Sequence, residues 1–229
     1  MAETLMVNEV FFSIQGEGTR AGLACGFIRL TGCHLRCHYC DTEYAFHEGR
    51  RWAIGDILTE VERLSGGCGL VEVTGGEPLL QPNVHTLMAR LCDADKTVLL
   101  ETSGACDISR CDPRVIRIMD LKTPDSGECE RNLWSNLEYL TVRDEIKFVI
   151  GSRRDYQWMR EVVRKRALAE RVGAVLVGAV EAVSPGREIR GSASLSLREL
   201  AEWVLRDRLP VRLQTQLHKL IWDPAMRGV

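Results

Sequence analysis

Three cysteines, Cys33, Cys37 and Cys40, lie close together in the chain at the spacing C-x3-C-x2-C. Thiolates this close can all face one point, so the pattern indicates a bound metal or metal cluster. Structural zinc normally takes four protein ligands, usually from two C-x2-C pairs, and the chain offers only the pair Cys37 and Cys40. A 4Fe-4S cluster held by three cysteines leaves one iron open to a substrate or cofactor. The spacing therefore favours an iron–sulfur cluster that takes part in chemistry.

Two glycine-rich segments carry glutamates that suit ligand binding. Residues 15–18 read Gln-Gly-Glu-Gly, where the glycines let the backbone approach a ligand and Glu17 can accept two hydrogen bonds from an amino-heterocycle. Residues 74–78 read Thr-Gly-Gly-Glu-Pro, where the glycines expose backbone groups to a cofactor and Glu77 can accept from an ammonium group. This segment follows the cysteine triplet, a combination that is uncommon by chance.

The elements that must position these residues are alternating strands and helices. Apolar runs predict strands at residues 7–14, 25–30, 70–73, 97–101, 115–119, 145–150, 172–177 and 211–214. Apolar residues at helical spacing predict helices at residues 57–64, 84–91, 159–163 and 197–205. Gly66 and Gly67 end the first helix, and Ser196 with Glu199 forms a capping box for the last.

This alternation, with polar groups repeatedly at the C-terminal ends of strands, predicts an α/β fold with a parallel sheet. A complete eight-stranded barrel typically needs ~250 residues. The chain is shorter, and residues 121–141 look irregular. We therefore predict an incomplete, TIM-like β/α barrel of about six parallel strands, in a single domain that spans residues 1–229.

Composition limits the partners. With 229 residues, 45% of them hydrophobic, the chain can bury a core, and 30 basic against 32 acidic side chains give a net charge of -2. No electrostatic surface for nucleic acid is expected, so a small molecule is the natural partner. The absence of a long apolar run and of an export signal predicts a cytoplasmic protein without membrane insertion. In that reducing compartment, the nine cysteines indicate metal binding by a few and burial or exposure for the others.

The cysteine triplet together with Gly-Gly-Glu-Pro resembles the radical S-adenosylmethionine superfamily. That resemblance implies a radical SAM core whose three cysteines bind a 4Fe-4S cluster, with the amino and carboxylate groups of S-adenosylmethionine on the fourth iron. Reductive cleavage of the cofactor then gives a radical that abstracts hydrogen from the substrate. An open iron, a glycine segment for the ammonium group and a barrel that shields a radical match this chemistry.

Within that superfamily, nearly the whole chain resembles the 7-carboxy-7-deazaguanine synthase family. The matching segments are residues 13–18, 40–42, 74–78, 101–104, 120–122 and 216–219. The resemblance implies a carbon–nitrogen lyase that contracts the ring of 6-carboxy-5,6,7,8-tetrahydropterin to 7-carboxy-7-deazaguanine with loss of ammonia, in queuosine and 7-deazapurine biosynthesis. It also implies a homodimer and an external, flavodoxin-like electron donor.

The same resemblance assigns roles to individual residues. The cluster ligands are Cys33, Cys37 and Cys40, and Thr42 is the Mg²⁺ ligand. S-adenosylmethionine contacts fall on Tyr39, Cys40, Asp41, Gly76, Glu77, Asp120, Leu121 and Lys122, with backbone contacts at residues 178–180. Substrate contacts fall on Ile14, Gln15, Gly16, Glu17, Arg29, Thr74 and His218. Glu17 would read the amino-pyrimidine edge, and Arg29 would pair with the substrate carboxylate. The tail at residues 223–229 receives no role.

Two other classes of protein compete with this interpretation. A glycyl-radical activating enzyme shares the cysteine spacing but acts on a protein backbone, and it gives no reason for Gln-Gly-Glu-Gly before the cluster. A zinc-stabilised binding module without catalysis does not account for Gly-Gly-Glu-Pro. Protein that carries stoichiometric zinc and no iron would favour the second alternative.

Overall fold

The computed structural model describes residues 3–223 and 226–229 of the chain. In this part of the chain, nine strands form one sheet in the order β3-β1-β2-β4-β5-β6-β7-β8-β9. The strands are β1 (Thr4–Ile14), β2 (Ala24–Leu30), β3 (Arg50–Ala53), β4 (Leu70–Gly75), β5 (Thr97–Thr102), β6 (Ile116–Asp120), β7 (Glu145–Ile150), β8 (Ala174–Ala179) and β9 (Arg212–Gln214). The helices are α1 (Ile54–Ser65), α2 (Val84–Asp93), α3 (Arg153–Lys165), α4 (Leu168–Arg171), α5 (Leu197–Asp207) and α6 (Leu217–Ile221).

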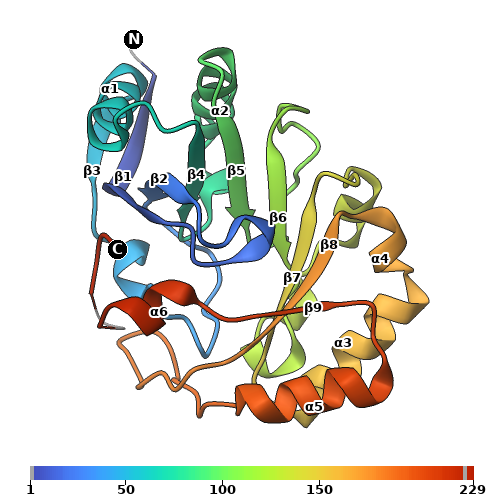
Figure 1. The fold of residues 1–229 in the computed structure, drawn as a ribbon. Helices are drawn as coiled ribbons and strands as arrows, with labels where there is room; N and C mark the ends of the chain where they lie inside the picture. The colour runs from blue at the N-terminus through green and yellow to red at the C-terminus, as the bar shows by residue number, and fades with distance from the viewer. Residues whose placement is uncertain (1–2, 224–225) are drawn as a thin grey trace.

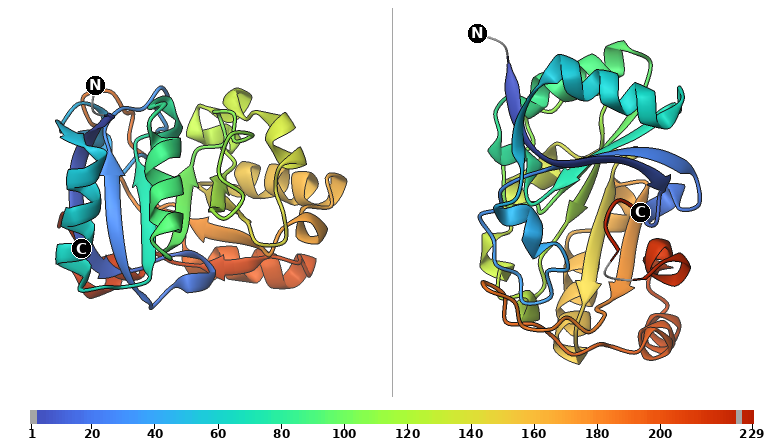
Figure 2. Two further views of the ribbon diagram at one scale, coloured as in Figure 1. Left: turned by 90° about the horizontal axis from the view of Figure 1, so that it is seen from above. Right: turned by 90° about the vertical axis from the view of Figure 1, so that its left-hand side faces the viewer.

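The sheet is mostly parallel and curves into an open barrel. Strands β2 and β4 to β9 pair in parallel, whereas β1 pairs antiparallel with β2 and with β3 at one edge. Figures 1 and 2 show the helices α1 to α5 on the outside of the curved sheet, while α6 lies across its open side near the C-terminus. The predicted partial β/α barrel is confirmed. The parallel part has seven strands rather than about six, and β9 has only three residues.

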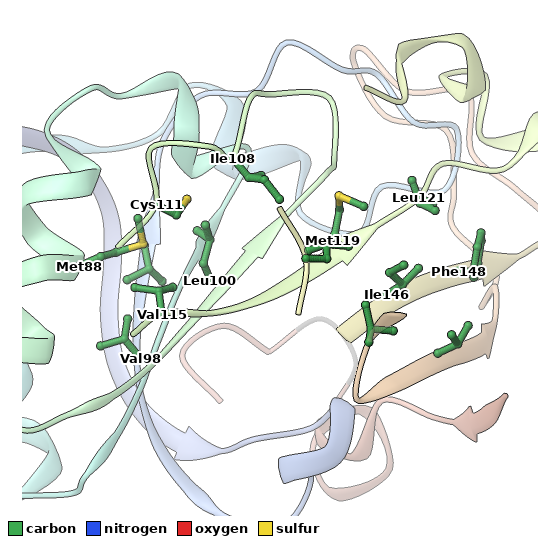
Figure 3. Close-up of a cluster of buried hydrophobic side chains, with 14 of the residues drawn as sticks. Met88, Val98, Leu100, Ile108, Cys111, Val115, Met119, Leu121, Ile146 and Phe148 are labelled. Carbon is green, nitrogen blue, oxygen red and sulfur yellow. The ribbon is translucent and has the colours of Figure 1, made fainter. Parts of the chain in front are cut away.

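Side chains alternate between the two faces of the sheet, and each face has its own apolar cluster. Residues such as Val98, Met119 and Phe148 point outward under the helices and belong to the larger cluster, part of which is drawn in Figure 3. The smaller cluster plugs the barrel interior and consists of Phe11, Cys25, Phe27, Leu70, Leu99, Ile116 and Ile118. On β2, β4, β5 and β6, the residue two positions after the last plug residue is charged. These residues therefore also face the interior, and they are Arg29, Glu72, Glu101 and Asp120. The barrel thus has an apolar floor and a charged mouth.

Most of the predicted helices and strands are present, and local signals explain where several end. Helix α1 stops at Gly66, whose φ of 56° is left-handed, and the Ser196 hydroxyl accepts a hydrogen bond from the backbone N–H of Glu199 at the start of α5. The prediction missed β3, α4 and α6, which have four, four and five residues. Residues 121–141 contain short 3₁₀ turns, as their irregular sequence predicts. Among the described residues, no helix combines the length and the apolar character needed to cross a membrane.

Candidate functional site

A cavity of about 270 Å³ opens where the parallel strands end. The predicted residues that line it are Ile14, Gln15, Gly16, Glu17, Arg29, Cys33, Cys37, Tyr39, Cys40, Asp41, Thr42, Thr74, Gly76, Asp120, Lys122 and His218. Residues 178–180 and Val229 line it as well, whereas residues 224 and 225 of the tail lie outside the described residues. The fold therefore brings segments from both ends of the chain to one chamber.

Two of the predicted cofactor contacts do not reach this cavity. The Glu77 side chain is fully buried, and its carboxylate accepts hydrogen bonds from the Thr102 and Ser103 hydroxyls and from the backbone N–H of Ser103. Leu121 points to the outer face, where it packs in the apolar cluster near Met119 (Figure 3). The structure thus differs from the prediction at Glu77 and Leu121, whose side chains lie outside the cavity. The alternation along β6 and the segment after it explains the second case, because Asp120 and Lys122 face inward and Leu121 must face outward.

The cysteine loop follows β2 and is fastened to the ends of neighbouring segments. The backbone N–H of Glu77 donates to the carbonyl of Gly32 at 2.8 Å, and the N–H of Gly76 donates to that of Leu30 at 3.1 Å. On the other side, the N–H of His38 donates to the carbonyl of Ser126 at 2.9 Å. The loop that carries the three thiols is thus held between the end of β4 and the turn after β6.

The glycines of the Gly-Gly-Glu-Pro segment make this close approach possible. A Cβ atom on Gly76 would lie 2.2 Å from the carbonyl oxygen of Gly32 and 2.9 Å from the Cβ of Cys33. Gly75 adopts a φ of 146°, and a Cβ there would lie 2.2 Å from the carbonyl oxygen of Leu30. Both positions therefore require glycine, because any larger residue would push β4 away from the cysteine loop.

The thiols lie among buried charges. Burial raises the pKa of Cys33, Cys37 and Cys40, to about 12 for Cys37, while the nearby Lys122 ammonium opposes the shift. The bare thiols are therefore protonated at neutral pH, and a bound metal cluster must displace their protons. No three His, Cys, Asp or Glu side chains converge on a single metal ion among the described residues. The C-x3-C-x2-C spacing favours a cluster, because it offers one C-x2-C pair where structural zinc usually takes two.

An incompletely bonded carboxylate lies beside the cysteine loop. Lys122 Nζ donates to Asp120 Oδ2 at 2.7 Å, whereas Asp120 Oδ1 is buried and has no hydrogen-bond partner in the described part of the chain. Buried polar atoms are normally hydrogen-bonded. A polar ligand that donates hydrogen bonds, such as the amino group or ribose of S-adenosylmethionine, fits this atom.

The end of the cysteine loop contacts the C-terminal helix. Lys219 Nζ on α6 donates to Asp41 Oδ2 at 2.7 Å, and the Lys219 ammonium outweighs the effect of burial, so that the pKa of Asp41 is lowered. Thr42 Oγ1 lies 3.7 Å from Cys40 Sγ and faces the cavity. Through the contact between Lys219 and Asp41, helix α6 near the C-terminus packs against the cysteine loop.

Segment 15–18 forms the opposite wall, and Glu17 is its best-bonded residue. Glu17 Oε2 accepts from Lys147 Nζ and from Gln214 Nε2, each at 3.1 Å, and Glu17 Oε1 accepts from Gln216 Nε2 at 2.8 Å. The Gln15 amide oxygen accepts from the backbone N–H of Glu17 at 3.1 Å. The segment is therefore fixed before any ligand arrives.

His218 and Arg29 are held at the edges of the same chamber. A Cβ on Gly16 would lie 2.6 Å from His218 Nδ1, so the imidazole packs on the Gly16 backbone, and burial lowers the pKa of His218. Arg29 Nε donates to Glu9 Oε1 at 2.7 Å, and the guanidinium lies over the rings of Phe11 and Tyr44. A planar cation fixed in this way can bind a carboxylate.

Three ionisable residues on the strands also line the cavity: Glu72 on β4, Glu101 on β5 and Lys147 on β7. Glu101 belongs to the matching segment 101–104, whereas no motif indicates Glu72 or Lys147. Lys147 Nζ donates to Glu101 as well as to Glu17. Burial alone would lower the pKa of Lys147, but the carboxylates of Glu101 and Glu17 raise it well above its ordinary value. The sequence does carry one signal for these residues, namely a charged side chain within a predicted parallel strand. Side chains alternate along a strand, so such a residue can be assigned to the inward face.

Comparison with known proteins shows which class of protein has this fold and cysteine loop. Residues 27–122 match the family model described as the radical SAM superfamily, and this range contains the cysteine loop and β4 to β6. A solved structure, QueE from Escherichia coli, superposes with a TM-score of 0.72 at 22% identity, covering 93% of this chain and 94% of that chain. The fold and the cysteine loop thus define a radical S-adenosylmethionine protein with a partial barrel.

Two curated relatives narrow the assignment. The 7-carboxy-7-deazaguanine synthase of Koribacter versatilis is 42% identical over 98% of this chain and 100% of its own length. That of Chlorobaculum tepidum is 43% identical over 98% of this chain and 97% of its own. The chain belongs to the 7-carboxy-7-deazaguanine synthase family. Of the three classes considered from the sequence, the ring-contracting synthase is confirmed.

Proposed function

We propose that this chain converts 6-carboxy-5,6,7,8-tetrahydropterin to 7-carboxy-7-deazaguanine and ammonia, as a carbon–nitrogen lyase of queuosine biosynthesis. The observation that carries the proposal is the shared cavity, because the cysteine loop, Glu17 and Arg29 all line it. An acceptor for an amino-pyrimidine and a cation for a carboxylate thus face the place where radical chemistry would begin. The family membership supports the same reaction.

Cys33, Cys37 and Cys40 would hold the 4Fe-4S cluster, and the cofactor would lie between them and the end of β4. When bound and reduced, the cluster and S-adenosylmethionine supply hydrogen-atom abstraction. Gly76 leaves room for the amino-acid part of the cofactor, and Asp120 Oδ1 offers it a buried acceptor. Tyr39, Asp41 and Lys122 complete that wall.

The substrate would lie between segment 14–17 and the ends of β2 and β4. Glu17 would accept from the pterin amino group, and Arg29 would pair with the carboxylate. Thr74 and His218 line the same space, and the lowered pKa of His218 keeps its imidazole neutral near pH 7. Side chains at these positions would exclude bulk water from the bound ring, which would protect a reactive intermediate.

Mg²⁺ at Thr42 is a further part of the proposal. Thr42 lines the cavity, its hydroxyl would be a hard oxygen ligand, and Mg²⁺ commonly completes its shell with substrate and water. An external electron donor such as flavodoxin, a homodimeric state and a cytoplasmic location also belong to the proposal. All nine cysteines are free thiols, as suits a reducing compartment.

One assay tests the function. Anaerobically reconstituted protein is incubated with 6-carboxytetrahydropterin, S-adenosylmethionine, a reductant and Mg²⁺, and 7-carboxy-7-deazaguanine and ammonia are measured. We expect both products in equal amounts, and none from Cys37→Ala, whereas Cys129→Ser, outside the cavity, should behave as wild type. Cofactor cleavage without either product would contradict the assigned substrate. Omitting Mg²⁺ tests the role of Thr42 separately.

A further inference from the structure

Glu72 is a buried acid with no assigned role. It lies in the middle of β4, is 5% exposed, and faces the cavity from just above the apolar plug. Its neighbours along the strand on this face are Leu70 in the plug and Thr74 at the rim. A carboxyl at this depth costs folding free energy unless it is bonded or neutral. Its presence therefore requires a physical explanation.

A chain of hydrogen bonds around the barrel mouth includes Glu72. Gln15 Nε2 donates to Glu72 Oε2 at 2.5 Å, and the Gln15 amide oxygen accepts from the backbone N–H of Glu17. Glu17 is bonded to Lys147, and Lys147 to Glu101. Thr74 Oγ1 then donates to Glu101 Oε2 at 3.3 Å, which brings the chain back to β4. The chain thus begins and ends on β4, and we call its residues, Glu72, Gln15, Glu17, Lys147, Glu101 and Thr74, the mouth ring.

The charges in the mouth ring do not balance if every group ionises. Three carboxyls, Glu17, Glu72 and Glu101, share one ammonium, that of Lys147. Lys147 contacts Glu17 and Glu101, whereas Glu72 is bonded only to the neutral amide of Gln15 in the described part of the chain. Glu72 is therefore the member best placed to retain a proton.

The surroundings of Glu72 point the same way. It is faced by Cys25 from β2, by Glu101 from β5, by Glu17 from the loop after β1, and by Lys147 from β7. Burial and the carboxylates of Glu101 and Glu17 raise the pKa of Glu72, and the Gln15 amide and Lys147 only partly oppose them, which leaves it at about 8. A carboxylic acid can hold the Gln15 amide without adding a second negative charge beside the substrate.

We propose that Glu72 keeps its proton in the working enzyme and is a positioning residue that, through Gln15, sets the place of segment 15–17 against the substrate ring. This inference rests on the proposed function. As a neutral acid, Glu72 accepts from Gln15 on one oxygen and has an O–H on the other that can donate into the cavity. Binding of the flat pterin then depends on a neutral donor below it and on the fixed carboxylate of Glu17 at its edge.

Two substitutions separate charge from bonding. Glu72→Gln keeps a neutral acceptor and donor at the same place, whereas Glu72→Val removes both and leaves the Gln15 amide unpaired. We expect Glu72→Gln to keep the KM for 6-carboxytetrahydropterin within about threefold of wild type. Glu72→Val should raise KM roughly 10- to 100-fold, the effect of leaving a buried polar group unpaired, with a smaller change in kcat. Cofactor cleavage should become uncoupled from product formation in the valine variant.

Infrared spectra of the reconstituted holoenzymes at pH 7, recorded without substrate, show whether Glu72 is protonated. Wild type should show a carboxylic-acid carbonyl band that Glu72→Gln lacks. The matched control is Glu145→Gln, because Glu145 is a buried glutamate on β7 that is paired with Arg20 at 3.4 Å and lies outside the mouth ring. That variant should retain the band.

Several results would overturn the inference. These are a wild-type band that persists in Glu72→Gln, a glutamine variant as impaired in KM as the valine variant, or a valine variant with wild-type KM. Thermal unfolding of each holoenzyme shows whether Glu72→Val is folded, and the glutamine variant decides the charge question if it is not. If wild type does not convert the pterin, the proposed function fails, and the infrared result still decides whether Glu72 holds a proton.

Discussion

The Glu77 carboxylate accepts a hydrogen bond from the backbone N–H of Ser103 at 2.7 Å and so joins the end of β4 to the end of β5. The hydroxyls of Thr102 and Ser103 donate to the same carboxylate. Because Glu77 is fully buried, its hydrogen bonds hold two strand ends together beneath the cavity. The glutamate of Thr-Gly-Gly-Glu-Pro therefore supports the cofactor segment from behind, while Gly76 meets the cavity.

Replacing Glu77 by glutamine should destabilise the fold. The amide would present an NH₂ group to donors that now point at carboxylate oxygens, so the free energy of unfolding should fall by about 2 kcal/mol. Denaturant unfolding measures the change. Glu202→Gln, an exposed site on α5, is the control and should stay within about 0.5 kcal/mol of wild type. Equal small effects at both positions would mean that the buried contacts of Glu77 contribute little.

Replacing Gly76 by alanine should separate β4 from the cysteine loop. The new methyl group would overlap the Gly32 carbonyl at 2.2 Å and approach Cys33 Cβ at 2.9 Å, so the loop must move. We expect iron and sulfide content after reconstitution to fall well below that of wild type. Gly55→Ala is the matched control, because a Cβ there meets no atom within 4 Å and alanine favours the helix by up to about 1 kcal/mol. Full iron loading of the Gly76 variant would show that the loop tolerates the displacement.

The architecture followed from the sequence because its signals are local. Apolar runs marked the strands from β4 to β8, and the polar residues after them indicated the edge where the site lies. The short elements β3 and α6 carry no such signal. Strand β3 begins with two arginines and is fixed by pairing with β1, and α6 is placed by contacts with distant segments such as that between Lys219 and Asp41. Tertiary context decides elements of this length.

The site was predictable as far as motifs reach. Three motifs each indicated one wall of the cavity: segment 15–18, segment 74–78 and the cysteine triplet. No motif marks Glu72 or Lys147, which line the same cavity only because β4 and β7 curve around one interior. The direction of Glu77 was equally hidden, since the turn after β4 rotates its side chain toward β5. Pairings across the barrel are properties of the curved sheet and are absent from any short stretch of sequence.

Arg29→Gln should weaken substrate binding selectively. Loss of the guanidinium removes the proposed partner of the substrate carboxylate, so KM for the carboxylated pterin should rise roughly 10- to 100-fold. Arg29→Lys should lie between the glutamine variant and wild type, because an ammonium keeps the charge and loses the fork. Steady-state kinetics with S-adenosylmethionine at saturation make the measurement. Arg63→Gln, on the exposed face of α1, should match wild type. An unchanged KM for Arg29→Gln would place the substrate carboxylate elsewhere.

The pH dependence of stability should carry the signature of Glu72. A glutamate in the unfolded chain has a pKa of about 4.3, whereas burial and Glu101 raise the pKa of Glu72 in the folded protein to about 8. With a raised folded pKa, the stabilising contribution is fully present below the unfolded pKa and is lost as pH rises through the folded pKa. Between these values the unfolded chain releases a proton that the folded chain keeps, so the free energy of unfolding should fall by up to about 1.4 kcal/mol per pH unit.

Glu72→Gln cannot ionise and should lose that slope. Its free energy of unfolding relative to wild type should therefore increase steadily from pH 5 to pH 8, measured by anaerobic denaturant unfolding of the reconstituted proteins. Glu101 does not produce the same trend, because Lys147 overcomes the effect of burial and lowers the pKa of Glu101, which places its titration below this range. Parallel profiles for wild type and Glu72→Gln would show that Glu72 is ionised in the folded protein, and the charge of the mouth ring would then have to be balanced by other groups.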